Sequence, residues 1–369
     1  MIDRRFGLIL VPLLLAVALI VACAPEQAPA PSSEGETEDS APATDEEEPV
    51  AAEAQSYTWQ VQSPWASGSP SGDLFAEFAV RVEDMTDGRL ELVVQPPGSV
   101  VPSLELLDGV GKGVLDACFS WPGWYAGKDP AFACLGGLPF AFNNDLELDA
   151  WFQHRGGLDM IREAYAPHNC YVVGMSYYNI ESWHASREIT TVDDLQGMKI
   201  RMPGGMLSDI FESVGCSVVL LPGEEVYTAL EKGVVDGVDW ATPADNYAYG
   251  FHEIAKYFTW PGWHHLPANE FMVNQDMWDE LPADLQITLE AAIREWAFER
   301  CTTLLIEDYA AVDAMIAQGC TPVAWDEEEI LKLRNIAVGV WDEWGAKSDL
   351  AGRVIDSTKD FMRLLGQIS

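Results

Sequence analysis

Arg201 is the residue best suited to hold an anion. It lies in a strand-like run, residues 199–202, and is followed within two positions by Pro203-Gly204-Gly205, where a loop begins. A guanidinium presents a planar fork of N–H donors that matches the two oxygens of a carboxylate. In a chain with 59 acidic residues, a structural ion pair is the alternative. We expect Arg201 to bind a ligand carboxylate or to pair with an acidic side chain.

Asp239 and Trp240 belong to a second candidate strand. In open α/β sheets, the carboxyl ends of the strands face the crevice where ligands bind. A carboxylate next to a main-chain carbonyl oxygen suits a hard cation such as Ca²⁺. The alternatives are an N-capping role for Asp239 and a core position for Trp240.

This second strand follows a short sequence motif that occurs twice in the chain. Residues 112–117 (KGVLDA) recur 120 positions later as residues 232–237 (KGVVDG). In each copy the Gly suits a helix C-cap, where φ is positive, and the apolar run that follows is typical of a buried strand. The repeat predicts two similar α/β units. A cleft between such units is a common place for a small ligand.

Strand-like and helix-like segments alternate around these corners, which favours an α/β fold. A longer pattern begins at Pro282 and continues to residue 317 without another Pro or a Gly. At ~1.5 Å per residue this helix would be about 54 Å long, enough to brace both units. A second helical stretch covers residues 327–344. The other expected strands are 57–61, 90–94, 171–175, 199–202, 217–220 and 271–274, and the other expected helices are 73–85, 145–152, 158–166 and 206–214.

The N-terminal 56 residues are expected to lie outside the folded part. Basic residues precede an apolar run, residues 6–22, that is short for a membrane span and ends before Cys23. This pattern resembles a bacterial lipobox, which implies cleavage of residues 1–22 and lipid modification of Cys23; an ordinary signal peptide is the alternative. Residues 24–56 hold ten acidic and no basic residues and are predicted to form a disordered tether.

The composition excludes one class of partner. A net charge of −38 argues against nucleic acid. Besides Cys23 there are six cysteines, which leaves disulfides or free thiols open, and no CxxC or zinc spacing occurs.

Several segments resemble the soluble receptors of tripartite ATP-independent periplasmic (TRAP) transporters, the DctP family. The repeated KGVxD corners fit this family, and the similar segments keep the family's order from residue 57 to about residue 318. They are residues 79–101, 126–140, 193–203 and 269–281.

The resemblance implies a periplasmic-binding-protein-like α/β fold. Two α/β domains would surround a cleft, with hinge strands between them and a long C-terminal helix bracing both. The first domain is expected at 57–177 and about 267–318, including the long helix, and the second at 178–266. C-terminal helices would occupy 319–369.

The implied function is that of an extracytoplasmic receptor, not an enzyme, lipid-anchored in the periplasm or at the outer cell surface. It would capture a small organic acid, a 2-oxo or 2-hydroxy monocarboxylate above all, and deliver it to the membrane permease subunits. In the branch that binds 2-oxo acids and lactate, a cation, Ca²⁺ or Na⁺, bridges to the ligand. Whether two copies associate as a homodimer stays open.

The family pattern also assigns roles to single residues. Arg201 matches the arginine that holds the ligand carboxylate. Asp239, where the family carries a Glu, and the carbonyl oxygen of Trp240 would help to hold the cation. Asn179 and Glu181 lie where polar ligand contacts are expected, and Glu181 is a further candidate metal ligand.

The aromatic residues are expected to wall the cleft. Trp121, Trp124 and Tyr125 follow the first repeated corner and would line the wall opposite Arg201 or pack in the core. Trp263 and His265 close an aromatic-Pro-Gly-Trp run that marks the 2-oxo acid branch, although two histidines replace the acid found there.

Two rival functions have specific arguments. A Trp-rich cleft with many carboxylates would also suit a secreted glycoside hydrolase. However, no Ser/His/Asp, HExxH or Gly-rich phosphate motif is present. A sensor subunit that binds the same ligand is the other alternative.

Overall fold

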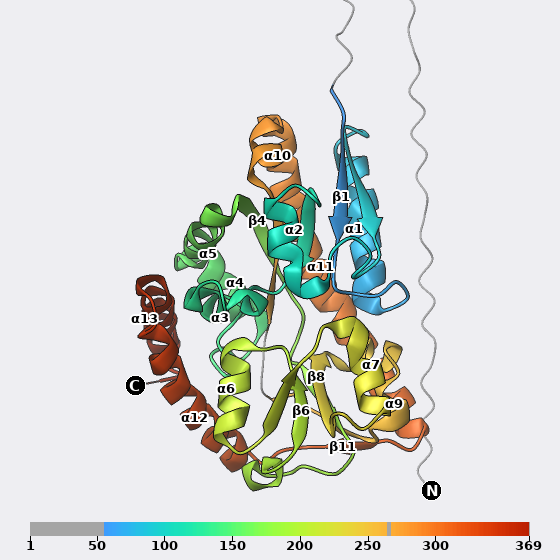
Figure 1. Ribbon diagram of the computed structural model, residues 1–369, viewed down its shortest axis with the longest axis vertical. Coiled ribbons are helices and arrows are strands. Elements are labelled where there is room, and N and C mark those ends of the chain that lie inside the picture. The colour runs from blue at the N-terminus through green and yellow to red at the C-terminus, as the bar shows by residue number, and fades with distance from the viewer. Residues whose placement is uncertain (1–54, 264–266, 369) are drawn as a thin grey trace, which may run out of the picture. The chain divides into compact units, whose positions relative to one another are not determined.

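The computed structural model describes residues 55–263 and 267–368 (Figure 1). The expectations for the first 54 residues, including Cys23, and for His265 lie outside the described residues. Within them the chain forms the predicted α/β fold, with two sheets and helices packed around them. None of the described helices is both long and apolar enough to span a bilayer.

The strands are β1 (Tyr57–Gln62), β2 (Leu90–Gln95), β3 (Ala117–Ser120), β4 (Cys170–Tyr177), β5 (Ser182–Ala185), β6 (Lys199–Met202), β7 (Ser217–Leu220), β8 (Gly237–Ala241), β9 (Tyr257–Thr259), β10 (Ala268–Asn274) and β11 (Thr321–Val323). The α-helices are α1 (Pro70–Met85), α2 (Leu106–Gly111), α3 (Pro130–Leu135), α4 (Asp145–His154), α5 (Gly157–Tyr165), α6 (Gly205–Ser213), α7 (Gly223–Glu231), α8 (Pro243–Ala248), α9 (Phe251–Ile254), α10 (Gln275–Glu280), α11 (Ala283–Ala317), α12 (Glu327–Gly345) and α13 (Asp349–Leu364).

The two sheets have the same internal order. The first runs β2-β1-β3-β10-β4 and the second β7-β6-β8-β5-β9, with β11 added at the edge. In each, the first three strands are parallel and the next one is antiparallel to its neighbours. The two units that the repeated motif predicted are therefore present as two equivalent sheets.

The repeated corners also have the same local geometry. Gly113 and Gly233 both have positive φ, +69° and +64°, as the C-cap prediction requires. The carboxylate of Asp116 accepts a hydrogen bond from the main-chain N–H of Gln60 at 2.6 Å, and that of Asp236 from Lys199 at 3.0 Å. Each Asp thereby ties its corner to the neighbouring strand, which sets where β3 and β8 begin.

The chain crosses from the first sheet to the second and later back again. It leaves the first sheet after β4, enters the second at β5, and returns after β9 to form β10. Strand β10 inserts between β3 and β4 and is antiparallel to both. Residues 178–181 thus form one crossing segment, and Pro267 lies just before β10 at the end of the other.

The long helix α11 contacts elements of both sheets, as Figure 1 shows in orange. It packs on β4 and α1 on one side and on α8 and β11 on the other. It begins at Ala283, with Pro282 as the preceding N-cap rather than the first helical residue. Helices α12 and α13 follow and pack on α3, α5 and α6.

The described cysteines carry free thiols, and most of them are buried. The sequence left disulfides or free thiols open, and for the six cysteines after Cys23 the structure has free thiols.

Candidate functional site

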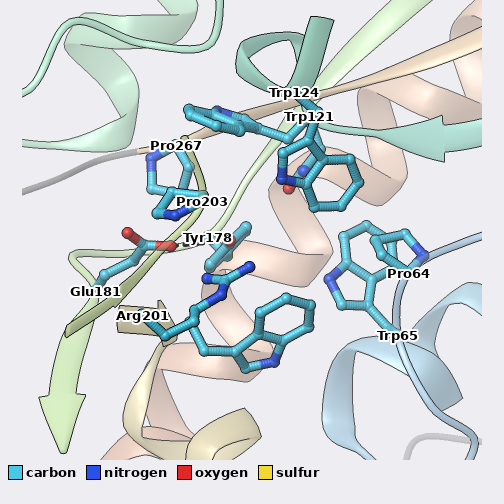
Figure 2. Close-up of a pocket in the computed structure, with 11 residues that line it drawn as sticks. Pro64, Trp65, Trp121, Trp124, Tyr178, Glu181, Arg201, Pro203 and Pro267 are labelled. Atoms are coloured by element: carbon cyan, nitrogen blue, oxygen red, sulfur yellow. Dashed lines mark hydrogen bonds between the residues drawn. The ribbon is translucent and has the colours of Figure 1, made fainter. Parts of the chain in front are cut away.

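A cavity lies where the strand ends of both sheets meet the crossing segment (Figure 2). From the first sheet come the residues after β1 and β3 and the start of β10, and from the second come the ends of β6 and β8. The remaining wall is the crossing segment after β4. The lining residues are Pro64, Trp65, Trp121, Trp124, Tyr178, Glu181, Arg201, Pro203, Trp240, Pro267 and Asn269.

Arg201 is held in place by main-chain oxygens. It is almost fully buried in β6, and its Nε and Nη2 donate to the carbonyl oxygen of Leu221 at 3.0 and 2.9 Å. Nη1 donates to the carbonyl oxygen of Asp239. A guanidinium has five N–H donors. These bonds therefore leave one N–H donor on each terminal nitrogen.

Two acidic side chains lie beside this arginine. Glu181, at 3% exposure, comes from the crossing segment, and Asp239, fully buried, comes from β8. Burial and the negative charge of Asp239 raise the pKa of Glu181 well above its ordinary value. Burial lowers the pKa of Arg201 to about 10, against the opposing effect of both acids, so the guanidinium stays protonated at neutral pH. Two carboxylates that raise one another's cost of ionisation form a place for a proton or a cation.

The opposite side of the cavity is aromatic. Figure 2 shows the indoles of Trp121 and Trp124 across from the guanidinium of Arg201. Trp121 is fixed by its Nε1–H, which donates to the carbonyl oxygen of Gly136 at 2.9 Å, and its ring meets that of Trp124 edge-on at 6.4 Å. The cavity measures only about 30 Å³, which is room for two or three water molecules at roughly 10–15 Å³ each. Its walls must therefore separate before a molecule of several heavy atoms can enter.

The cavity gathers most of the residues that the sequence singled out. Arg201, Glu181, Trp240, Trp121 and Trp124 line it, and Asp239 lies immediately beside Arg201 and Glu181.

Three other candidates lie elsewhere. Tyr125 packs in the first unit's core and donates its hydroxyl to Ser120. Asn179 points toward α11, where its amide donates to Asp308 at 3.2 Å, and it lines a separate cavity of about 340 Å³ between α4 and α11. Trp263 stacks on Trp325 with ring centroids 4.2 Å apart.

Sequence reasoning missed several lining residues, among them Trp65, Tyr178, Pro203 and Asn269. One signal was available for two of them. Trp65 follows β1 and Pro203 follows β6, and these two strands occupy equivalent places in the two sheets. Carboxyl ends of parallel neighbours lie at one edge, so residues after β1 belong with those after β3.

Known proteins match both the sequence and the fold. Residues 61–348 match the family model DctP, bacterial extracellular solute-binding protein, family 7. A monocarboxylate 2-oxoacid-binding periplasmic protein from Nostoc sp. is 28% identical over 308 residues, which cover 83% of this chain and 84% of that protein.

Two solved TRAP solute-binding proteins are each 26% identical to this chain. The protein from Bordetella bronchiseptica, with calcium and picolinate bound, has a TM-score of 0.79, covering 85% of this chain and 94% of the other. The protein from Pseudoalteromonas atlantica, with sodium and pyruvate bound, has a TM-score of 0.75, covering 85% and 95%.

The fold and the cavity between two sheets define the class of solute-binding proteins, which bind their ligands without chemical conversion. The chain belongs to the DctP family of bacterial extracellular solute-binding proteins. The rival reading as a secreted enzyme is accordingly not supported, since the matching proteins are transport receptors.

Proposed function

We propose that this protein is the solute receptor of a TRAP transporter, that its ligand is a small organic monocarboxylate, and that a cation bridges the ligand to the protein. A 2-oxo or 2-hydroxy acid is the favoured ligand, delivered to the membrane permease subunits. The observation that carries the proposal is the position of the Arg201 guanidinium beside the Glu181–Asp239 pair in one buried cavity.

Arg201 supplies the site for the carboxylate. Its main-chain hydrogen bonds orient the guanidinium before any ligand arrives, so little side-chain entropy is lost on binding. It is the only Arg or Lys among the described residues that line the cavity, and aromatic rings and prolines make up most of the remaining wall. A single positively charged side chain in an otherwise largely apolar wall favours a ligand with one carboxylate over a dicarboxylate.

The residues beside Arg201 fit a bound cation. Glu181 and Asp239 offer carboxylate oxygens that repel each other when both are ionised, and a cation removes that repulsion. Carboxylate and carbonyl oxygens, with an oxygen of the ligand, are donors that Ca²⁺ accepts. When bound, the cation would supply a positive charge for the 2-oxo or 2-hydroxy oxygen. Asp239 and Glu181 would hold it, with the carbonyl oxygen of Trp240 as a further ligand.

Capture would follow from closure. Because the walls come from both sheets, a ligand that touches both stabilises the state in which they are close together. The crossing segment that carries Tyr178 and Glu181 belongs to both the hinge and the cavity wall. A sensor subunit would bind its ligand in the same way. A comparison of ligand uptake between the wild-type strain and a permease-deletion strain therefore separates transport from sensing.

The test is a binding experiment with the purified protein, freed of co-purified ligand by unfolding and refolding. Pyruvate and lactate, each with Ca²⁺, with Na⁺ and with a chelator, are compared with malonate and a sugar acid by calorimetry and thermal unfolding. A ligand at 100 times its Kd stabilises the folded state by about 2.7 kcal/mol. We expect a cation-dependent shift with the monocarboxylates. The absence of a shift with every carboxylate would refute the organic-acid proposal.

A further inference from the structure

The long helix α11 carries a fully buried arginine directly behind the cavity wall. Nη1 of Arg300 donates to Oγ of Ser176 and to Oδ1 of Asn269, both at 3.2 Å, and Nη2 donates to Oγ of Ser71 at 3.1 Å. One rigid group therefore contacts the end of β4, the start of β10 and the first turn of α1.

The same guanidinium lies between two aromatic rings. Its carbon is 4.1 Å from the ring centroid of Trp65 and 4.4 Å from that of Tyr178. Cation–π contacts of this kind are strongest when they are shielded from water, as they are around this buried guanidinium. They therefore help to fix the orientation of the Trp65 and Tyr178 rings.

Three of the residues that Arg300 contacts line the ligand cavity, namely Trp65, Tyr178 and Asn269. Asn269 is oriented from both sides, because its Oδ1 accepts from Arg300 while its Nδ2 donates to the carbonyl oxygen of Ser120 at 3.0 Å. The amide cannot rotate without losing one of these bonds. Arg300 thus contacts three residues of the wall from behind, although it does not line the cavity itself.

The direct contacts found for this guanidinium among the described residues are all with neutral groups. The nearest linked carboxylate is that of Asp245, which Ser71 reaches through its own hydroxyl at 2.5 Å. Burying a charge with neutral partners is costly unless its hydrogen bonds are well made. Among the described residues Nε of Arg300 is itself buried without a hydrogen-bond partner, so the cost of burial is not fully offset and packing alone does not explain an arginine here.

A second contact of the same helix reaches the same crossing segment. Asp308, eight residues after Arg300 and so on the same face of the helix, accepts a hydrogen bond from Asn179 at 3.2 Å and another from the main-chain N–H of Ala244 at 2.9 Å. Helix α11 therefore holds the segment between β4 and β5 at two points.

We propose that Arg300 is a positioning residue for ligand binding, which holds Trp65, Tyr178 and Asn269 in the cavity wall and ties the end of β4, the crossing segment after it and the start of β10 to α11. The expected loss of ligand affinity rests on the proposed function, whereas the expected effect on the crossing segment and its neighbouring strands does not. A lysine would keep the charge without the planar fork that bridges Ser71 to Ser176 and Asn269.

The test compares Arg300→Lys with Arg294→Lys as the matched control. Arg294 lies on the same helix, is 55% exposed at its side chain, and approaches Asp149 at 3.6 Å. The first measurement is hydrogen exchange of the two variants and the wild type without ligand. We expect faster exchange in residues 176–182 and 268–274 of Arg300→Lys alone. Unchanged exchange there, or a rise spread evenly over the chain, would overturn the proposal.

The second measurement is the affinity for pyruvate with Ca²⁺. We expect a loss of at least tenfold in Arg300→Lys and a change within twofold in Arg294→Lys. In a double-mutant cycle, Arg300→Lys and Asn269→Ala should be non-additive, because both act on one wall. Additive effects in the cycle would contradict the positioning role. If the wild type binds no carboxylate, the proposed function fails, while the exchange experiment still decides the role of Arg300.

Discussion

The guanidinium of Arg201 lies over the indole ring of Trp240, 5.0 Å from its centroid. The same guanidinium donates to the carbonyl oxygen of Asp239, the residue before this tryptophan. The end of β8 therefore orients the arginine from two sides. It also carries the carboxylate that is expected to hold a cation, so the carboxylate and cation parts of the site are coupled through one dipeptide.

Replacing Arg201 with Lys should weaken ligand binding strongly. The ammonium group cannot donate to Leu221, Asp239 and both oxygens of a carboxylate at once. Disrupting a buried charged contact costs about 2 kcal/mol or more, which is roughly thirtyfold in Kd. Calorimetry with pyruvate and Ca²⁺ measures the loss. Arg187→Lys, at an exposed arginine that donates to the carbonyl oxygen of Asp194, is the matched control and should bind as the wild type does. Equal affinities of Arg201→Lys and wild type would exclude Arg201 as the carboxylate site.

Glu181 should make the stability of the cation-free protein depend on pH. Its pKa is raised in the folded state, so the folded protein holds this proton more tightly than the unfolded chain, where the pKa is about 4.3. The contribution to the free energy of unfolding is complete below that pH and is lost as the pH rises through the raised value. Urea unfolding between pH 4 and 9 should show this decline. Glu181→Gln should make it less steep, and other buried acids such as Glu270, whose pKa burial raises to about 8, account for the remaining slope.

A cation in the proposed site would replace that proton, which would give the same residue a second signature. The affinity for Ca²⁺ should rise with pH in the wild type, because binding releases the proton. In Glu181→Gln the affinity should fall at all pH values and lose this dependence. Wild-type Ca²⁺ affinity in the variant would remove Glu181 from the proposed cation site.

Local patterns predicted the elements that carry strong signals. The strands at 199–202 and 217–220 and the long helix were correct to within a residue, because short apolar runs and an uninterrupted helical period depend little on the rest of the chain. The short strands β5, β9 and β11 were not predicted, since their pairing partners are distant in sequence.

The site shows the same limit. Arg201 and Asp239 were singled out because each lies near the carboxyl end of a strand-like run and matches a family position, and the structure places them side by side. Asn179 and Glu181 lie two residues apart on one crossing segment, yet one faces α11 and the other the cavity. That direction is set by the packing of α11 on the segment, which no local pattern records. Trp263 stacks on Trp325, which lies just before α12 and is distant in sequence, so local patterns could not predict this contact either.

The two repeated corners should respond equally to mutation. Gly113→Ala and Gly233→Ala place a Cβ in open space, but at positive φ, so each change costs only the backbone strain of about 1 kcal/mol. A loss of about 2 °C in Tm is expected for each, and the double variant should show their sum. Gly127→Ala is the control, since its Cβ also meets nothing and its φ is not positive. A loss at one corner alone would show that the corners are not equivalent.

Cys23→Ser should release the protein from the membrane. The lipobox-like pattern places this cysteine at the expected cleavage point, where lipid modification would anchor the chain and the variant could not be modified. We expect wild-type protein in the membrane fraction, with a lipid mass on an N-terminal Cys23 peptide, and the variant in the soluble extracytoplasmic fraction. Cys301→Ser, which alters a half-buried thiol in the folded part, should remain with the membrane. An unmodified N-terminus at another residue in the wild type would instead identify an ordinary signal peptide.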